Sequence, residues 1–231
     1  MHMTVEGLGR SIVKRAQIRL HHSLIDFAHD RLQGTETHGQ HWPADRSLGS
    51  PSARHANKYE PSPTAIFNRL LKALDLDVSS FVFVDLGSGK GRTLLMAAER
   101  PFVRVEGVEI AGDLHQTALR NIEHAHSKGK PLAPMVARHM DALTYEFPQE
   151  PFVLYLFNPF DAELMAQVRD RLRASLKVAR QDCFIIYLNS KHRRLFDQDE
   201  TFAELPRMAW ERAIDRLLSP WPFAIYRGRR G

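Results

Sequence analysis

Cysteine and long hydrophobic runs are nearly absent from this 231-residue sequence. Its single cysteine, Cys183, cannot form a disulfide within the chain, and the apolar run Cys183–Leu188 favours an inert core thiol over a catalytic one. No apolar stretch approaches the ~20 residues that span a bilayer, and no signal peptide is recognisable. We therefore expect no transmembrane segment, a reducing compartment and a cytoplasmic location.

Two common ligand signatures are missing as well. Seven of the twelve histidines precede Lys58, but their spacing matches no helical or finger-like ligand pattern, so no metal site is expected. A phosphate-binding loop requires Gly, four residues and then Gly-Lys-Ser/Thr, whereas here Lys90 is followed by Gly91. The net charge of +5 is spread over small clusters of lysine and arginine, which permits a nucleic-acid partner without demonstrating one.

The most informative part of the chain is a strand, a turn and a helix start within Phe81–Met96. Phe81–Leu86 is a short apolar run rich in aromatic and β-branched residues, which is typical of a buried parallel strand. A helical pattern resumes at Leu94. Without a Cβ at the turn, backbone N–H groups at the helix start can approach a ligand closely, so a nucleotide or cofactor site is predicted. The turn contains Gly87, Ser88, Gly89 and Gly91.

The charge of this turn narrows the kind of ligand. Asp85 precedes the first glycine by two residues, and its carboxylate would repel a pyrophosphate but attract a cation. S-adenosylmethionine carries an ammonium and a sulfonium and no phosphate, so it suits an acidic turn. The glycine spacing differs from the Gly-x-Gly-x-x-Gly of dinucleotide-binding folds, which argues against the alternative of an NAD(P)-dependent oxidoreductase. A plain strand-to-helix turn with a capping Asp is another alternative.

A second carboxylate follows at the expected distance. Val103–Glu109 reads as the next strand and ends in Glu109, 18 residues beyond Gly91. In a doubly wound sheet, an acid at the end of the second strand accepts hydrogen bonds from the hydroxyls of an adenosine ribose. Glu109 is therefore the candidate ribose ligand, and the alternative is a strand-end Glu exposed to water.

These residues resemble the class I S-adenosylmethionine-dependent methyltransferases, whose first motif is a strand ending in Asp-x-Gly-x-Gly-x-Gly. "FVDLGSGKGRTLLMAAE" followed by "VEGVEI" is similar to bacterial members of uncharacterised activity and to the branch that contains non-SET protein-lysine methyltransferases. The resemblance extends from about Tyr59 to Leu188. It implies the reaction class and the cofactor but not the methyl acceptor. The cofactor ligands implied around the turn are Asp85, Gly87, Ser88, Gly89, Gly91, Glu109 and Ile110.

Further cofactor contacts are implied by the same resemblance. Asp141 and Ala142 follow a third predicted strand, Met135–His139, where an Asp of the family accepts the adenine amino group and the next N–H donates to the ring. A loop Asp is the alternative. In similar methyltransferases a Tyr-x-Pro-x-x-Thr segment folds over the methionine end of the cofactor, which implies contacts from Tyr59 and Thr64. An equally simple role for Thr64 is to cap the helix that follows it.

The fourth predicted strand ends in Asn158-Pro159-Phe160. This tripeptide resembles the Asp/Asn-Pro-Pro-Tyr/Phe motif of amino-group methyltransferases, shortened by one proline. The resemblance implies that Asn158 and a backbone carbonyl accept hydrogen bonds from the target nitrogen while Phe160 packs on the acceptor. Asn158, Pro159 and Phe160 are therefore the candidate catalytic residues, and Asn158 is also a candidate cofactor contact. The acceptor, whether protein, RNA or small molecule, stays open, as does the oligomeric state. A strand-ending turn is the alternative for the motif, and a non-catalytic cofactor- or RNA-binding module is the alternative for the protein.

Alternating strand and helix signals between Phe81 and Leu188 predict a doubly wound α/β fold with a parallel sheet. Weak strand signals beyond it would suit the antiparallel pair that closes the family's seven-stranded sheet. Before it, basic amphipathic helices are predicted within residues 8–32, packed on the domain in preference to a membrane surface, and a linker within 34–57. We expect an N-terminal helical extension, 1–58, and a methyltransferase domain, 59–231. The weak strand signals lie at Thr201–Leu205, Trp210–Leu218 and Pro222–Arg227.

Overall fold

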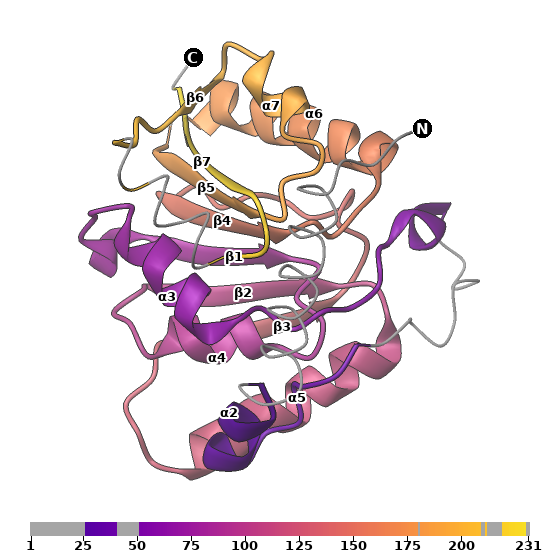
Figure 1. Ribbon diagram of the computed structural model, residues 1–231, viewed down its shortest axis with the longest axis vertical. Coiled ribbons are helices and arrows are strands. Elements are labelled where there is room, and N and C mark those ends of the chain that lie inside the picture. Colours follow the sequence, from indigo (N-terminus) through magenta and orange to yellow (C-terminus); the bar gives the residue numbers. More distant parts are fainter. Residues whose placement is uncertain (1–25, 41–50, 180, 209–210, 212–218, 230–231) are drawn as a thin grey trace, which may run out of the picture.

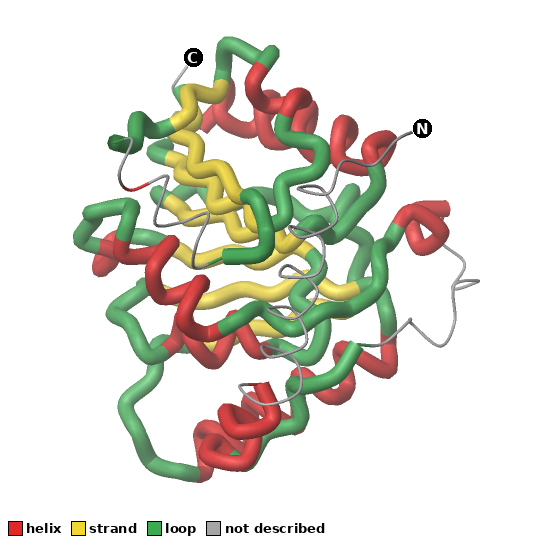
Figure 2. Tube along the Cα trace, in the orientation of Figure 1, coloured by secondary structure: helices red, strands yellow, loops and turns green. Residues whose placement is uncertain are grey.

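A seven-stranded sheet forms the centre of the structure, with strand order β3-β2-β1-β4-β5-β7-β6 (Figure 1). The structure is a computed structural model and describes residues 26–40, 51–179, 181–208, 211 and 219–229. Helices cover both faces of the sheet, which gives three layers (Figure 2). The predicted α/β fold with a mostly parallel, seven-stranded sheet is confirmed.

Five neighbouring strands of the sheet are parallel. They are β1 Val82–Leu86, β2 Arg104–Glu109, β3 Met135–His139, β4 Phe152–Phe157 and β5 Cys183–Leu188. β7 (Phe223–Gly228) pairs antiparallel with β5, and β6 (Phe202–Glu204) pairs antiparallel with β7. The strand signals at Thr201–Leu205 and Pro222–Arg227 are therefore confirmed. The signal at Trp210–Leu218 lies almost entirely outside the described residues.

Alternating side chains of the central strands face two hydrophobic clusters. Val84 and Leu86 belong to the cluster covered by α6 and α7, whereas Phe83 belongs to the cluster covered by α3 and α4. Because β1 is buried along its whole length, it is apolar at nearly every position and does not alternate. The described α-helices are α2 Asp26–Gln33, α3 Thr64–Lys72, α4 Arg92–Ala98, α5 Gly112–Ser127, α6 Ala162–Ala179 and α7 Arg194–Asp197.

The predicted N-terminal helix is present where the chain is described, but it does not dock as expected. Phe27 and Ala28 were expected on its apolar, domain-facing side, and both are exposed. Among the α2 side chains that the structure describes, Asp30 is the buried one, at 3% exposure. Hydrogen bonds and an ion pair of Asp30 therefore hold this part of the helix on the domain. Residues 8–25 of the predicted helices lie outside the described residues.

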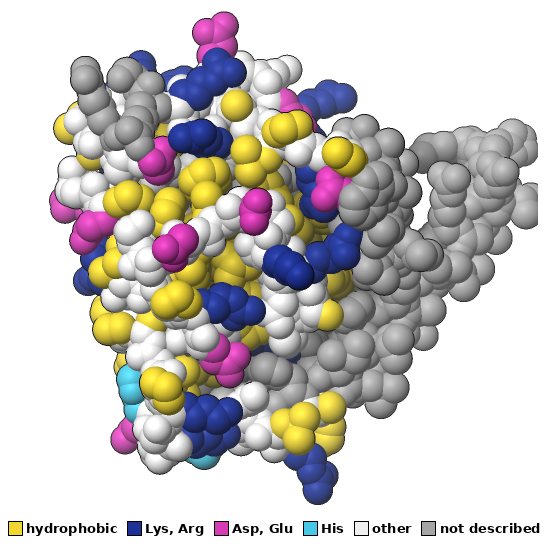
Figure 3. Space-filling model, turned by 90° about the vertical axis from the view of Figure 1, so that its left-hand side faces the viewer, with side chains coloured by type: hydrophobic (Ala, Val, Ile, Leu, Met, Phe, Trp, Pro, Cys, Tyr) yellow, Lys and Arg dark blue, Asp and Glu magenta, His cyan; other side chains and the backbone are white. Residues whose placement is uncertain are grey.

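Two smaller features near the chain's start bear on the site. α3 begins at Thr64 itself and its N-cap residue is Pro63, which makes no side-chain cap bond, so Thr64 does not hold the N-cap position that the capping role requires. Proline at the boundary fits because it favours an extended backbone before a helix. Residues 51–55, within the predicted linker, form a 3₁₀ turn. None of the helices that the structure describes is long and apolar enough to cross a membrane. On the face drawn in Figure 3, Lys and Arg side chains are spread among hydrophobic and acidic ones and do not gather in one patch.

Candidate functional site

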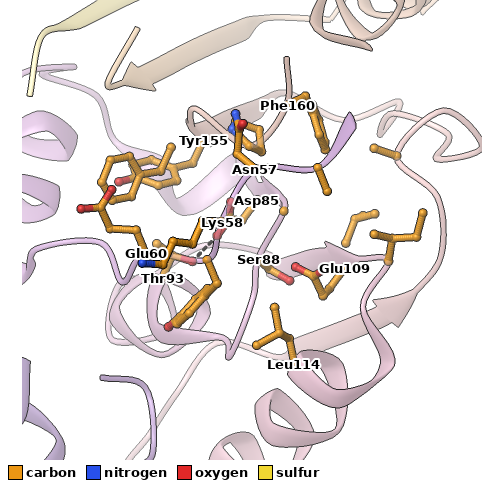
Figure 4. Close-up of a pocket in the computed structure, with 18 of the residues that line it drawn as sticks. Asn57, Lys58, Glu60, Asp85, Ser88, Thr93, Glu109, Leu114, Tyr155 and Phe160 are labelled. Atoms are coloured by element: carbon orange, nitrogen blue, oxygen red, sulfur yellow. Dashed lines mark hydrogen bonds between the residues drawn. The ribbon is translucent and has the colours of Figure 1, made fainter. Parts of the chain in front are cut away.

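One cavity lies at the carboxyl edge of the parallel strands, where β1, β2 and β4 end (Figure 4). Open α/β sheets bind their ligands at this edge. The chain between α2 and α3 supplies an outer wall, within residues 52–62. In this conformation the cavity is narrow, with a volume of about 60 Å³. Most predicted site residues line it, namely Tyr59, Asp85, Gly87, Ser88, Glu109, Ile110, Asp141, Ala142, Pro159 and Phe160.

The turn after β1 requires glycine because of both its backbone and its neighbours. Gly87 (φ +83°) and Gly89 (φ +55°) adopt left-handed conformations that other residues rarely adopt. A Cβ on Gly87 would lie 2.7 Å from the Cβ of Pro159, and one on Gly89 would overlap the ring of Tyr59. Gly91 is the N-cap of α4 and, like Gly89, does not itself line the cavity. The glycines thus let Pro159 and Tyr59 pack closely on the turn.

The carboxylate of Glu109, at the end of β2, is held by backbone N–H groups. Gly89 N donates to its Oε2 and Ala111 N to its Oε1, each at 2.8 Å. Burial raises the pKa of this carboxyl, and the backbone donors, including Ile110, offset only part of the effect. Ser88 Oγ, close to Glu109 in Figure 4, is buried and has no hydrogen-bond partner among the described residues. The hydroxyls of a ligand could satisfy both groups.

The carboxylate of Asp85, at the end of β1, is 3% exposed and is held differently. Its Oδ2 accepts a hydrogen bond from Thr93 Oγ1, on α4 (Figure 4). Desolvation raises the pKa of Asp85 to about 7 despite the Thr93 bond, and the charge of Glu109 adds to the rise. Near neutral pH this carboxyl therefore changes its protonation state, and a cation bound beside it would favour the ionised form.

Tyr59 joins the outer wall to the glycine turn. Its ring lies over Gly89, and the Lys90 ammonium lies 5.9 Å from the ring centre. Its hydroxyl donates to Thr37 O at 2.6 Å, so the segment after α2 fixes the orientation of the ring. The predicted place of Tyr59 beside the cavity is thus explained by contacts that span the extension and the sheet.

A buried ion pair next to the cavity has no counterpart in the sequence-based predictions. Arg92, the first residue of α4, lines the cavity and is 2% exposed. Its Nη2 lies 3.4 Å from Asp30 Oδ1, and its Nε donates to Thr37 Oγ1 at 2.6 Å. Asp30 Oδ2 also accepts from Thr37 N at 2.6 Å and bonds His38 Nδ1 at 2.8 Å. Asp30 and Arg92 are 62 residues apart, so no local pattern could have linked them.

Burial and hydrogen bonding act against each other at Asp30. Burial by itself raises the pKa of this carboxyl, but the bonds from Thr37 and His38 and the charge of Arg92 together hold it below its ordinary value. Asp30 is therefore ionised at neutral pH and pairs with Arg92. This pair, together with the hydrogen bond from Lys128 Nζ to Gln33 O, anchors the described part of α2 to the domain.

The end of β4 differs from the expectation drawn from its motif. Pro159 and Phe160 line the cavity, but Asn158 does not. Asn158 is 6% exposed, has a left-handed backbone (φ +44°), and its Oδ1 has no hydrogen-bond partner among the described residues. Its backbone oxygen accepts from Asn57 Nδ2 at 2.8 Å. The structure does not bring Thr64 to this cavity either, because Thr64 lines a second one between α3, α4 and α5.

The remaining predicted ligands follow β2 and β3. Ile110, Asp141 and Ala142 lie together in the cavity wall. Asp141 Oδ1 accepts from Leu143 N at 2.8 Å, so part of this carboxylate orders its own loop, as in the loop-Asp alternative. Within the described ranges no cluster of His, Cys, Asp and Glu could hold a metal ion.

Comparison with protein-family models gives no match, and comparison with curated protein sequences gives none either. Solved structures do match. Magnesium protoporphyrin IX methyltransferase from Synechocystis PCC 6803, solved with bound SAM, aligns with a TM-score of 0.50 at 10% identity, over 96% of this chain and 97% of that chain. The Escherichia coli protein yhhF, named as a candidate methyltransferase, aligns with a TM-score of 0.51 at 13% identity, over 76% and 93%. The chain therefore has the fold of class I S-adenosylmethionine-dependent methyltransferases.

Proposed function

We propose that the protein is an S-adenosylmethionine-dependent methyltransferase that acts on a nitrogen acceptor. The observation that carries the proposal is the pair of buried carboxylates, Asp85 and Glu109, beside a glycine turn in one cavity of this fold. A dinucleotide would place phosphate charge at the glycine turn, close to the Asp85 carboxylate. S-adenosylmethionine presents an ammonium, a sulfonium and two ribose hydroxyls, which match an acidic, hydrogen-bond-accepting wall.

Each part of the cofactor has a counterpart among the residues of the cavity. We assign the ribose hydroxyls to Glu109, with Ser88 Oγ beside it as an additional partner. The adenine is assigned to the wall formed by Ile110, Asp141 and Ala142. The amino-acid end is assigned to the region of Asp85, Gly87 and Tyr59, where the carboxylate of Asp85 can pair with the ammonium.

The chain's contribution to the reaction is mainly positional. Bound S-adenosylmethionine supplies an activated methyl group and a neutral thioether leaving group. The protein holds the acceptor's lone pair in line with that methyl group, and positioning of this kind can lower a barrier by roughly 7–11 kcal/mol. Phe160 and the carbonyl groups at the end of β4 are our candidates for packing on the acceptor and accepting its N–H groups.

The proposal favours an acceptor nitrogen that is already neutral. A lysine with an ordinary pKa near 10.4 must lose its proton first, which costs about 4.6 kcal/mol at pH 7 (3.4 pKa units at 1.36 kcal/mol each). An amide or an exocyclic amine requires only hydrogen-bond acceptors, which the end of β4 offers. Transfer of a labelled methyl group to fractionated cell protein, RNA and small molecules distinguishes these acceptors. Label found only on protein lysines would contradict this preference.

Calorimetric titration tests the cofactor assignment directly. We expect S-adenosylmethionine and S-adenosylhomocysteine to bind with micromolar affinity, and Glu109→Ala to weaken binding by about ten- to a hundredfold, because a hydrogen bond to a charged group contributes roughly 1.5–3 kcal/mol. Glu123→Ala on the exposed side of α5 is the matched control and should bind like the wild type.

The alternatives are tested in the same titration. Reduced nicotinamide cofactor should not bind, because its pyrophosphate would face the Asp85 carboxylate beside the glycine turn. Binding of the nicotinamide cofactor with none of either sulfur compound, in protein shown to be folded by circular dichroism, would favour the oxidoreductase. Cofactor binding without methyl transfer to any acceptor fraction would favour a non-catalytic binding module.

A further inference from the structure

The outer wall of the cavity near β4 is a short segment, residues 53–57, which we call the strap. It runs antiparallel to the turn that follows β4. Ala56 and Phe160 form an isolated antiparallel bridge. On either side of this bridge, Asn57 N donates to Pro159 O at 2.9 Å and Asp161 N donates to His55 O at 3.0 Å. The strap therefore covers the cavity by pairing with the turn after β4 through two backbone hydrogen bonds.

Two side-chain contacts strengthen this closure. Asn57 Nδ2 donates to Asn158 O at 2.8 Å. His55 Nδ1 lies 2.6 Å from Asp161 Oδ2, and Asp161 Oδ1 accepts from Leu164 N at the start of α6. The strap is thereby tied to both the strand end and the following helix. Its contacts cross more than 100 residues of sequence.

The walls of the cavity differ in how easily they can move. β1, β2 and β4 are inner strands of the sheet, so moving them would break their pairing on both sides. The strap pairs with the turn after β4 through one isolated bridge with a backbone bond on either side, and it is not one of the strands of the seven-stranded sheet. Its Ala56 and Asn57 line the cavity, whose volume of about 60 Å³ is far below the 300–1,000 Å³ of ordinary small-molecule sites. A nucleoside-sized ligand therefore requires movement of a wall, and a segment joined by one isolated bridge can move at lower cost than an inner strand of the sheet.

We propose that the strap is the gate of this cavity and that Asn57 is its latch. In the closed form Asn57 donates to the backbone oxygens of both Asn158 and Pro159, which are the acceptors offered by the end of β4. Opening the strap admits the cofactor and releases these two oxygens for an incoming acceptor nitrogen. This proposal rests on the proposed function, since it takes the cavity to be the cofactor site.

A disulfide between the strap and the β4 turn tests the gate in one protein. Ala56 and Phe160 form the non-hydrogen-bonded type of antiparallel pair, in which Cα atoms lie about 4.5 Å apart, within the range that a disulfide bridges. The native Cys183 is fully buried, so it does not compete. With labelled S-adenosylhomocysteine as the probe, the oxidised Ala56→Cys/Phe160→Cys variant should bind at least tenfold more slowly than the same protein after reduction. Equal association rates would overturn the proposal.

Weakening the latch should have the opposite effect. Asn57→Ala removes the side-chain bond to Asn158 and keeps the backbone bond, so the open fraction and the association rate should rise about three- to tenfold. Asn68→Ala, which removes the bond between Arg100 and Asn68 Oδ1 on α3, is the matched control and should associate like the wild type. An Asn57→Ala rate no higher than the control's contradicts the latch.

Failure of the proposed function gives a different result. If neither the wild type nor the reduced double variant binds S-adenosylhomocysteine, the cofactor assignment is wrong. The gate is then judged by amide hydrogen exchange at Asn57 and Asp161, which should be three- to tenfold faster in Asn57→Ala than in Asn68→Ala. Equal exchange would show that Asn57 does not hold the strap.

Discussion

Asp30 and Asp85 are both 3% exposed, yet their surroundings drive their pKa values in opposite directions. Asp30 of α2 accepts from several donors and pairs with Arg92 of α4, an ion pair that we call the clasp, so its pKa lies below the ordinary value. Asp85, in the cavity floor, is bonded by Thr93 and lies near another carboxylate, so burial raises its pKa to about 7. Equal burial thus has unequal consequences, because the number and charge of the partners decide the outcome.

The two aspartates should also act oppositely on folding as the pH changes. The folded pKa of Asp30 lies below its unfolded value, so its stabilisation is present above the unfolded pKa and is lost as the pH falls. The folded pKa of Asp85 lies above its unfolded value. Its contribution to stability is therefore fully present below the unfolded pKa and is lost as the pH rises through the folded pKa of about 7. At neutral pH the ionised Asp30 stabilises the fold, whereas ionising the buried Asp85 costs stability. A cation bound beside Asp85 would offset that cost.

Removing the charge of the clasp is expected to have the largest effect. Asp30→Asn leaves Arg92 buried without its carboxylate, and breaking one side of a buried pair costs roughly 3–5 kcal/mol. Urea denaturation measures the loss, and hydrogen exchange at Thr37 locates it. Asp77→Asn, at an exposed turn, is the control and should change little. A loss no larger than in the control would mean that the clasp does not anchor the extension.

Removing the charge of the cavity floor should stabilise the protein. Asp85→Asn abolishes the cost of ionising a buried carboxyl, which is about 4 kcal/mol above pH 7, from a rise of about 3 pKa units at 1.36 kcal/mol each. The gain at pH 8 should exceed the gain at pH 5 by about 2–3 kcal/mol in urea denaturation. Affinity for S-adenosylmethionine should fall at least tenfold, because the ammonium loses its charged partner. A gain that does not depend on pH would contradict the raised pKa.

The smallest expected effect is a shift in the pH dependence of binding. Because the bound ammonium requires ionised Asp85, affinity for S-adenosylmethionine should weaken by about tenfold per pH unit below 7 and level off above it. Thr93→Val removes the hydroxyl bond that lowers the pKa, so the midpoint should move up by about one unit. Thr117→Val on α5 is the control. Calorimetry across pH 5.5–9 measures the affinity of the wild type and of both variants. A Thr93→Val midpoint equal to that of the wild type would rule out this role of Thr93.

The part of the site built from consecutive residues could be predicted from the sequence. The strand, glycine turn and acids of β1 and β2 depend on contacts within about 30 residues, and their spacing alone placed Asp85, Gly87 and Glu109 in one cavity. The mostly parallel α/β sheet followed from the alternation of strands and helices, and its seven strands with an antiparallel pair followed from the family resemblance. The cofactor roles of these residues stay predictions until binding is measured.

The part built from distant residues could not be predicted. Arg92 pairs with Asp30, and Asn57 covers the end of β4 at Asn158, although neither partner carries a local signal of the other. The N-terminal extension was therefore expected to be a packed helix followed by a linker, whereas its Ser52 and residues 56–58 line the cavity. Side-chain hydrogen bonds across long sequence separations leave no periodicity for a sequence pattern to reveal.

The strap also sets an order of events during synthesis of the chain. Asn57 leaves the ribosome before Asn158, its partner 101 residues later. At 5–20 residues per second, the strap waits about 5–20 s before the strand that receives it exists. The parallel strands can begin to associate during that interval. The wall that is translated first is therefore docked last, and a nascent chain halted before β4 would contain the glycine turn with an open side.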